Sequence, residues 1–541
     1  MNALKLRPRS AILILGIAGT LLSVLYSPTT SVAQDVVPRT YSIVDTGQVR
    51  CYDNSVEIEF PAPGAAFAGQ DAYYAGNQPK YSDNGDGTVT DLVTGLMWEK
   101  DPGEKVTYEG AVADAALCRA GGCDDWRLPS IKELYSLIQF SGKDPDPMAG
   151  ETDDLQPFID TDYFDFLYGD SDRGERIIDS QFATSTKYVS TTMNGNETMF
   201  GVNFADGRIK GYPIGSNRSG RRGPPQKTYY VLYVRGGEGY GENQFRDNGD
   251  STITDQATGL TWMKQDSGSF EVGENGDGKL NWEQSIRWCE ELEFAGHSDW
   301  RLPNVKELQS IVDYTRSPDT TQSAAIDPIF QTTPILDPSG ETNFGFYWSG
   351  TTHARGYGGE SASYVAFGRS QGWMSSFTGE YRLLDVHGAG SQRSDPKAGD
   401  PSRFPQGRGP QGDVIAIYNL VRPVRDGAAE IQQSGPRLEE RPSGRTPGGG
   451  RPGRGGFGGF GSEELGLGGA EPGNMRPGPG GMNPGGQLGF VRRLDRDGDG
   501  KVSRQEFDGP SNAFDMHDVD SDGFLTDDEA PQGPPMMGGG F

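Results

Sequence analysis

The stretch Asp125-Trp126-Arg127-Leu128-Pro129 occurs twice in this chain of 541 residues, the second time at residues 299–303. Each occurrence is followed by the tripeptide Lys-Glu-Leu, at residues 132–134 and 306–308. The offset between the two occurrences is 174 residues (299 − 125). A repeat of this length is typical of a duplicated domain, because solenoid repeats are only roughly 20 to 50 residues long.

A second pair of motifs lies upstream in the same order. Residues 83–98 read DNGDGTVTDLVTGLMW and recur as DNGDSTITDQATGLTW at residues 247–262, an offset of 164 residues (247 − 83). Two separated motifs therefore recur in order, which indicates two copies of one domain. We call residues 81–237 copy one and residues 241–426 copy two.

Each copy is predicted to have a mixed α+β fold. The Asp-Asn-Gly-Asp run favours a turn, and the alternating residues after it predict a strand. Apolar residues at helical spacing predict a helix over residues 111–117 and 286–292, and a second helix that begins at Pro129 and Pro303. Further strands are predicted at 189–192, 200–204 and 229–235 in copy one and at 348–352, 364–367 and 415–422 in copy two. Most of the recurring tryptophans are expected in the core, and the alternative for one or two of them is a sugar site: Trp98, Trp126, Trp262, Trp300 and Trp348.

The rest of the chain divides by composition. Gly and Pro make up 20 and 6 of the 46 residues from 444 to 489. Such a segment cannot bury a core, so we expect a disordered linker there. The expected order is a signal peptide (1–33), a lead-in segment (34–80), copy one (81–237), copy two (241–426), a Gly/Pro-rich linker (427–489), a pair of calcium loops (490–530) and a flexible tail (531–541).

The first residues are typical of a secretory signal peptide. A basic start with Lys5, Arg7 and Arg9 precedes an apolar stretch at 11–26 and small residues at 31–33. We expect cleavage near Gln34 and export to the periplasm, the cell surface or the medium; an uncleaved anchor is the alternative. No later stretch has 18 consecutive apolar residues, so no membrane span is expected after cleavage.

The formal net charge is −27. A charge of this sign argues against nucleic acid as a partner, because phosphate binding requires basic patches. Of four cysteines, Cys118 and Cys123 flank a short loop that could be closed by a disulfide in an exported protein. Their pairing stays open at this point, and Cys51 and Cys289 are expected to be free and buried.

Residues 495–506 and 518–529 each fit a 12-residue calcium loop. Acids at alternate positions surround one ion, Gly at position 6 permits the turn, and Glu at position 12 binds with both oxygens. The predicted ligands of two Ca²⁺ ions are Asp495, Asp497, Asp499, Glu506 and the carbonyl of Lys501, then Asp518, Asp520, Asp522, Glu529 and the carbonyl of Phe524. Val502 and Leu525 are expected to pair in a short strand between the loops.

These two loops resemble the EF-hand family. They begin only 23 residues apart (518 − 495), which leaves room for short helices only. The resemblance therefore implies a small helical EF-hand pair with constitutive or structural calcium, rather than a sensor that opens an apolar groove.

Two further kinds of calcium site are considered. Residues 275–283 resemble the middle of a calcium loop, but Gly273 and Gln284 stand where the first Asp and last Glu belong. An inserted surface loop is the alternative. The acids of residues 83–91 and 247–255 are expected to cap β-turns with their own side chains.

Catalytic motifs are few. The four histidines, at positions 297, 353, 387 and 517, form no HExxH motif. Residues 368–372 fit the GxSxG elbow of hydrolases. The equivalent turn of copy one, residues 206–208, has no Ser, so we expect a plain hairpin at both places. No catalytic residue is predicted.

The two recurring motifs resemble the Lcl C-terminal domain family, named for the end domain of a collagen-like bacterial adhesin. The order of a Cys-bearing helix, Trp-Arg-Leu-Pro, hairpins and a closing Val-Arg strand is also similar to the formylglycine-generating-enzyme group. This resemblance implies a C-type-lectin-like α+β fold, not an activity. The adhesin member binds sulfated polysaccharide, which implies an extracellular polysaccharide or surface protein as the partner.

Three hypotheses follow. The first is an exported, non-catalytic binding protein with two lectin-like modules and a calcium-binding tail. The second is an enzyme of the formylglycine-generating type or a hydrolase, against which the missing cysteine and histidine framework argues. The third is calcium-dependent docking or assembly by a dockerin-like tail, although dockerins usually have Asp at position 12 where both loops here have Glu.

Overall fold

The computed structural model describes residues 39–147, 149, 152, 154–193, 195–215, 227–237, 239–356, 358–375, 379–426, 430–431, 501–504 and 523–526. The chain forms two compact units. The first comprises residues 1–376 and 380–437, with Phe541, and holds both copies; the second comprises residues 377–379 and 438–540. No helix among the described residues is long and apolar enough to cross a membrane.

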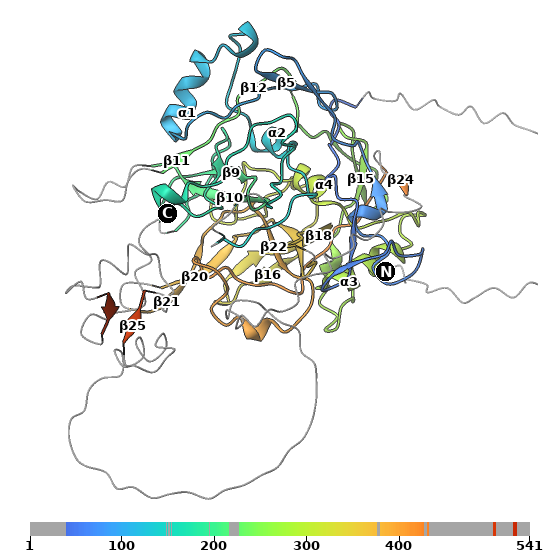
Figure 1. Ribbon diagram of the computed structural model, residues 1–541. Helices are drawn as coiled ribbons and strands as arrows, with labels where there is room; N and C mark the ends of the chain where they lie inside the picture. Colours follow the sequence, from blue (N-terminus) through green and yellow to red (C-terminus); the bar gives the residue numbers. More distant parts are fainter. Residues whose placement is uncertain are drawn as a thin grey trace, which may run out of the picture. The chain divides into compact units, whose positions relative to one another are not determined.

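Each copy begins and ends in its own four-stranded antiparallel sheet (Figure 1). In copy one the order is β12 (Val234–Arg235), β6 (Met97–Glu99), β5 (Thr88–Asp91) and β4 (Tyr81–Asp83). In copy two the order is β13 (Phe245–Asp247), β14 (Thr252–Asp255), β15 (Leu260–Met263) and β23 (Val424–Asp426). The strand predicted after each Asp-Asn-Gly-Asp turn is confirmed as β5 and β14.

Two short helices follow in each copy. They are α1 (Tyr108–Asp114) and α2 (Ile131–Tyr135) in copy one, and α3 (Trp282–Glu290) and α4 (Val305–Ser310) in copy two. Ser130 and Asn304 cap α2 and α4, each in a capping box with the Glu three residues later. The prediction that Pro129 and Pro303 begin these helices is wrong by two residues. Each proline lies just before the capping residue, and the helix begins just after it.

The central sheet has six strands and belongs to both copies. Its order is β18 (Phe346–Thr352), β19 (Ser361–Ala366), β22 (Gln392–Pro396), β10 (Arg208–Pro213), β9 (Thr198–Asn203) and β8 (Gln181–Phe182). Strands β18, β19 and β22 come from copy two, and strands β10, β9 and β8 come from copy one. The copies meet where β10 pairs antiparallel with β22, with Ile209 opposite Gln392. The strand order therefore has an approximate twofold symmetry.

The remaining strands form two-stranded ribbons. They are β1 (Cys51–Tyr52) with β2 (Glu57–Ile58), β3 (Tyr74–Ala75) with β24 (Glu430–Ile431), β7 (Val106–Thr107) with β11 (Thr228–Tyr229), β16 (Pro334–Leu336) with β17 (Thr342–Phe344), β20 (Gln371–Ser375) with β21 (Tyr381–Asp385), and β25 (Val502–Ser503) with β26 (Phe524–Leu525). Short 3-10 turns occur at Asp71–Tyr73, Ala115–Leu117, Ala120–Gly122, Ser171–Arg173, Ser267–Ser269 and Pro401–Arg403.

Two strand predictions are wrong and one is only partly right. Residues 189–192 and 415–422 form no strand, and residues 229–235 are strand only at their two ends. In the segment 415–422 the aliphatic side chains of Ile415, Ile417, Leu420 and Val421 are buried. The backbone, however, makes only isolated bridges, from Asn419 to Leu280 and from Leu420 to Tyr347. Burial of these side chains, rather than a regular ladder, produced the apolar pattern.

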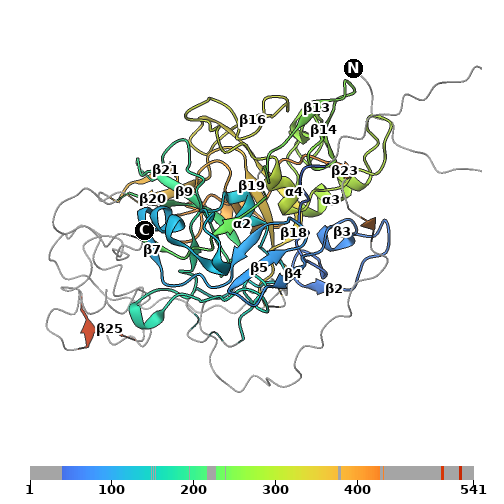
Figure 2. The same cartoon turned by 90° about the horizontal axis from the view of Figure 1, so that it is seen from above.

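The core is continuous across the copies. One hydrophobic cluster contains Leu134 and Ile138 beside α2 together with Leu308 and Ile311 beside α4, and α2 lies next to α4 in both views (Figure 1 and Figure 2). All five recurring tryptophans are buried, as predicted. The two copies therefore share one interior.

The lead-in segment packs on copy two, although it precedes copy one in the chain. Gln48 exchanges two hydrogen bonds with the backbone of Thr352, donating to its carbonyl and accepting from its amide. Tyr74 donates to Glu290, and the amide of Gly359 donates to Ser55. The chain therefore packs against copy two first and only then runs on to copy one.

Candidate functional site

The two predicted calcium loops lie partly within the described residues. Eight of the ten predicted ligands lie outside the described residues; Lys501 and Phe524 lie within them. The predicted strand pairing of Val502 with Leu525 is confirmed, since the two residues lie opposite each other in an antiparallel ribbon and both side chains are fully buried. Among the described residues, no group of three or more His, Cys, Asp or Glu side chains is arranged to hold a metal.

The Asp-Asn-Gly-Asp runs are self-capped turns in both copies, as predicted. Asp83 accepts from the amide of Gly85 at 2.8 Å, and its other carboxylate oxygen accepts from Lys100 at 2.6 Å. Asp247 makes the same contacts with Gly249 and Lys264 in copy two. These carboxylates therefore stabilise turns.

The polar side chains Asp277 and Asn281 of the loop at residues 275–283 accept hydrogen bonds from backbone amides nearby in the chain. Asp277 accepts from the amide of Lys279 at 3.2 Å, and Asn281 caps α3 by accepting from the amide of Gln284 at 2.9 Å. These contacts favour the surface-loop interpretation over a calcium site.

The GxSxG segment is not a hairpin in copy two, so that prediction is wrong. The strand before it, β19, pairs with β22, and the segment leads instead into the separate ribbon of β20 and β21. Ser370 is buried, and its carbonyl accepts from the amide of Val386. In copy one the predicted hairpin is confirmed, because β9 and β10 pair directly across the turn at Asp206 and Gly207.

All four cysteines are free thiols. Cys118 donates to Glu99 at 3.1 Å, and Cys123 lies near the carbonyl of Gly121. Burial raises the pKa of Cys118 to about 11 and that of Cys51 to about 12. Thiols with such pKa values stay protonated at neutral pH and are poor nucleophiles.

Sequence reasoning missed a cluster of charges on the shared sheet, which we call the central charge cluster. Its members are Asp144, Asp206, Arg208 and Lys210 of copy one and His353, His387, Arg393 and Asp413 of copy two. Each cation is paired with an acid: Arg208 with Asp144, Lys210 with Asp206, and Arg393 with Asp413. His387 Nε2 lies 2.8 Å from Asp413, and His353 Nε2 lies 2.9 Å from the carbonyl of Asp206.

The titration of this cluster follows from its burial and its pairs. Burial lowers the pKa of His353 and of His387 to about 4, and the neighbouring arginines act in the same direction. Burial alone would raise the pKa of Asp144, but Arg208, together with His353 and Arg355, outweighs it and holds the pKa at about 2. Both histidines are therefore neutral at pH 7 while Asp144 is charged. Each ion pair lies within one copy, and the cluster joins the copies through the contact of His353 with the carbonyl of Asp206 and the hydrogen bond from Arg208 to Ser394.

A second junction of the copies lies between α2 and α4. Lys132 on α2 donates to the carbonyl of Ser310 at 2.7 Å, and Lys306 on α4 donates to the carbonyl of Ser136 at 2.9 Å. Lys306 is the counterpart of Lys132, and Ser310 is the counterpart of Ser136; both pairs are 174 residues apart. The contact is therefore reciprocal, as in the interface of a twofold dimer.

A small pocket lies at this junction, and we call it the axial pocket. It is lined by Tyr41, Ile43, Val44, Lys132, Tyr135, Ser136, Tyr240, Gly241, Lys306, Gln309 and Ser310. Six of these residues form three matched pairs on α2 and α4, and the rings of Tyr41 and Tyr240 stand 5.0 Å apart. Its volume is about 20 Å³. This volume accommodates one or two water-sized ligands and is far below the roughly 300 Å³ of a drug-sized ligand site.

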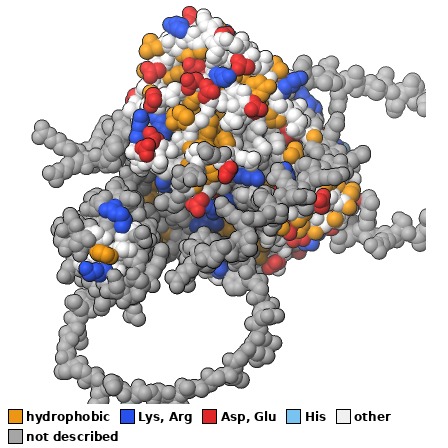
Figure 3. Space-filling view, in the orientation of Figure 1, with side chains coloured by type: hydrophobic (Ala, Val, Ile, Leu, Met, Phe, Trp, Pro, Cys, Tyr) orange, Lys and Arg blue, Asp and Glu red, His pale blue; other side chains and the backbone are white. Residues whose placement is uncertain are grey.

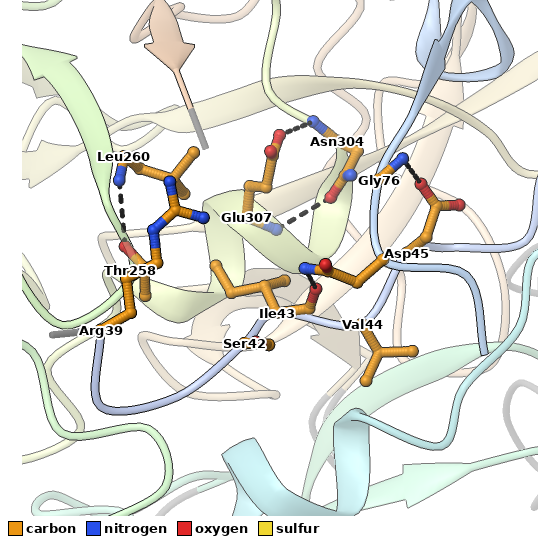
Figure 4. A pocket seen from close by; sticks show the side chains of 11 residues that line it. Arg39, Ser42, Ile43, Val44, Asp45, Gly76, Thr258, Leu260, Asn304 and Glu307 are labelled. Atoms are coloured by element: carbon orange, nitrogen blue, oxygen red, sulfur yellow. Dashed lines mark hydrogen bonds between the residues drawn. The ribbon is translucent and has the colours of Figure 1, made fainter. Parts of the chain in front are cut away.

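A neighbouring pocket lies between the lead-in segment and copy two (Figure 4). Asp45 accepts from the amide of Gly76 at 2.6 Å, and Glu307 and Asn304 exchange capping hydrogen bonds. Its room is about 30 Å³, which is again too small for a sugar ring.

A buried carboxyl fastens the lead-in segment to copy two. Asp71 accepts from the hydroxyls of Thr46 at 2.7 Å and Thr351 at 2.6 Å. Burial, with the negative charge of Asp45 nearby, raises the pKa of Asp71 to about 8. The carboxyl is therefore protonated in most molecules at neutral pH.

The chain was compared with known families, curated proteins and solved structures. The Lcl C-terminal domain matches residues 87–235 and residues 251–385, which together exceed half of the chain. No curated protein matches the chain, and no solved structure matches it. The two matched segments fall within copy one and copy two, which repeat the same turn, capped helix and sheet contacts. The chain therefore belongs to the Lcl C-terminal domain family and carries that domain twice.

Proposed function

We propose that this chain is an exported, calcium-binding protein whose paired Lcl C-terminal domains bind an extracellular or cell-surface ligand, a glycan or a protein, without catalysing a reaction. The observation that carries the proposal is the shared six-stranded sheet, which joins β10 of copy one to β22 of copy two. A sheet of this kind holds equivalent surfaces of the two copies at one separation. A fixed pair of binding surfaces suits a ligand with repeated units, because the second contact becomes intramolecular.

The described ionisable groups support binding over catalysis. The central charge cluster holds its three cations against three acids, and its histidines are buried. The thiols of Cys51 and Cys118 are protonated at neutral pH, as argued above. A group that is engaged in this way has little capacity to exchange protons with a substrate.

The surface gives the class of ligand only broadly. Figure 3 shows acidic and basic side chains interspersed over the described part of one face, without one large field of a single sign. Such a surface fits a neutral or mixed-charge polymer or a protein better than a highly sulfated chain. The proposed fold of each copy is C-type-lectin-like, on the resemblance given by its motifs.

The calcium part of the proposal rests on the tail. Two loops with complete ligand sets in sequence are joined by the ribbon of β25 and β26, in which Val502 and Leu525 are buried opposite each other. A short strand pair at position 8 of each loop is what couples paired EF-hand loops. The proposed ligands are the ten residues named from the sequence.

The test uses the mature full-length chain, because the shared sheet makes each copy part of the other's fold. We would measure binding to a panel of immobilised polysaccharides and to whole bacterial cells, in calcium and in chelator. Affinity should increase with polymer length until both copies are engaged. The control is the double variant Glu506→Gln/Glu529→Gln, which separates a role of the tail from that of the copies.

Two outcomes would contradict the proposal. One is an affinity that is the same for a short fragment and for the long polymer, because the two binding surfaces would then not engage one polymer together. The other is turnover of any panel member that a single substitution in one copy abolishes, which would favour the enzyme hypothesis. Calcium-dependent capture of a protein by the tail alone would favour the docking hypothesis.

A further inference from the structure

The axial pocket presents two ammonium groups from matched positions, one in each copy. Among the described residues that line it, none is acidic. Lys132 donates to three neutral acceptors, the carbonyls of Gly241 and Ser310 and the side-chain oxygen of Asn243. Lys306 donates to two, the carbonyls of Asp45 and Ser136. An ammonium carries three N–H donors, so one donor of Lys306 is left over.

Most of the nearest acids are engaged by other donors, although one buried carboxylate oxygen of Asp91 has no partner among the described residues. The five that influence the two lysines electrostatically are Asp45, Asp71, Asp91, Asp255 and Asp313. Asp45 accepts from two backbone amides and Asp71 from two threonine hydroxyls. Asp255 accepts from Asn243 and from the amide of Gln244. The compensation that a buried ammonium needs is thus supplied from a distance, not by a paired carboxylate.

A second residue that lines the pocket carries an unsatisfied donor. The hydroxyl of Tyr135 is buried, with the residue only 1% exposed, and it has no hydrogen-bond partner among the described residues. A buried hydroxyl without a partner costs free energy, and a bound guest that accepts hydrogen bonds removes that cost. A leftover N–H and a leftover O–H, carried by two residues that line one pocket, both require an acceptor.

The size and the lining determine the class of guest. The room of about 20 Å³ admits one or two water-sized particles. A guest that accepts hydrogen bonds, fits this room and offsets two positive charges is a small monovalent anion. Ile43 and Val44 form an apolar wall, which a weakly hydrated halide tolerates better than a multivalent oxyanion.

We propose that the axial pocket binds one small inorganic anion of halide size between Lys132 and Lys306, and that this ion helps to join the two copies. The proposal does not depend on the binding or calcium functions proposed above. It predicts that the folded chain takes up the anion and that the unfolded chain does not. By linkage, a ligand of the folded state alone raises stability with its concentration.

The first experiment measures the thermal unfolding of the full chain at pH 6, where both lysines are charged. Sodium chloride and sodium bromide are compared with sodium gluconate at equal ionic strength, with calcium held constant. The Tm should rise with halide concentration by a constant step per tenfold increase above Kd. The shift should disappear in Lys132→Met/Lys306→Met and persist in the control Lys80→Met, which changes an exposed lysine.

The second experiment uses the unmodified chain and stands even if the double variant does not fold. Crystals grown in bromide should give an anomalous peak in the axial pocket within hydrogen-bond distance of Lys306 Nζ. A water peak there, or an equal Tm shift in halide and gluconate, would overturn the proposal. A Tm shift that survives in a folded double variant would place the anion elsewhere and overturn it as well.

Discussion

The Nζ atom of Lys132 donates a 2.7 Å hydrogen bond to the carbonyl oxygen of Ser310, so a side chain of one copy ends on the main chain of the other. The reverse contact, from Lys306 to Ser136, completes the pair. Both lysines belong to the Lys-Glu-Leu tripeptide that first revealed the repeat. In each tripeptide the Lys reaches the other copy, the Glu caps its own helix, and the Leu is buried in the common core.

Separating the copies should prevent folding. Residues 34–237 and residues 238–426, expressed alone, would each expose one edge of the central sheet and half of the common core. We expect each half to be insoluble or unfolded by circular dichroism, and the two to form a soluble complex when co-expressed. A cooperative unfolding transition in either half alone would contradict this prediction.

Lys306→Met should change the pH dependence of stability. Burial lowers the pKa of Lys306 to about 7, against about 10.4 in an unfolded chain. Between these values the unfolded state binds more protons, so the free energy of unfolding rises with pH, by up to about 4 kcal/mol over the window. The variant should lose this rise. Denaturant unfolding from pH 6 to pH 10.5 in chloride-free buffer measures it, with Lys80→Met as the control; parallel profiles for all three chains would refute the prediction.

Asp71→Asn should have the opposite effect at lower pH. The pKa of Asp71 is raised to about 8, so between about pH 4 and pH 8 the folded state binds more protons than the unfolded state. This group therefore stabilises the fold below pH 4 and loses that contribution as the pH rises towards 8. The uncharged variant should gain stability relative to the wild type through this window, whereas Asp162→Asn, an exposed control, should not. An unchanged difference from pH 4 to pH 8 would contradict the assignment.

The two copies offer a matched test of a buried ion pair. Arg301 and Glu307 are both nearly inaccessible, with side chains 5% and 9% exposed, whereas Arg127, the equivalent of Arg301, is 40% exposed beside Glu133. Removing Arg301 leaves Glu307 uncompensated at a site closed to water, whereas removing the exposed Arg127 lets water reach Glu133, whose side chain is itself only 5% exposed. Arg301→Met should therefore cost about 3 kcal/mol of unfolding free energy, and Arg127→Met about 1 kcal/mol. Equal costs in chemical denaturation would show that burial does not decide the difference.

The tail should bind two calcium ions. Calorimetry on the full chain should give about two sites with Kd in the broad range of roughly 10⁻⁷ to 10⁻³ M. Glu506→Gln and Glu529→Gln should each weaken one site, because each removes a bidentate carboxylate. Substitution of Asp277 by Asn should leave the isotherm unchanged, since that carboxylate holds a turn. An unchanged isotherm in the Glu506→Gln/Glu529→Gln double variant would refute the ligand assignment.

Much of each copy could be predicted because its signals are local. The Asp-Asn-Gly-Asp turn, the strand after it and the buried tryptophans depend on neighbouring residues and hydrophobic pattern. The pairing of Val502 with Leu525 followed in the same way from position 8 of the two loops. The strand predicted at 415–422 failed because apolar content shows burial and does not distinguish a ladder from an irregular buried segment. The strand predicted at 189–192 failed for another reason: Val189 is exposed, and the segment makes only an isolated bridge at Thr192.

The junctions could not be predicted because they depend on where the copies meet. Arg208 and Lys210 alternate with apolar residues in β10, which is the pattern of a strand with one face in water. The sequence around their ion-pair partners, Asp144 and Asp206, does not indicate that these carboxylates are buried or paired. Lys132 and Lys306 were likewise indistinguishable in sequence from exposed lysines of two short helices, since the contact each makes lies in the other copy.

The ribbon of β3 and β24 has a mechanical consequence. Glu430 pairs with Ala75 and Ile431 with Tyr74, so the chain leaves its first unit beside the segment that entered it. A pull transmitted from residues beyond 431 would first strain these few hydrogen bonds, well before it reached the central sheet. The ribbon would then open under tension while the fold of the paired copies stayed intact.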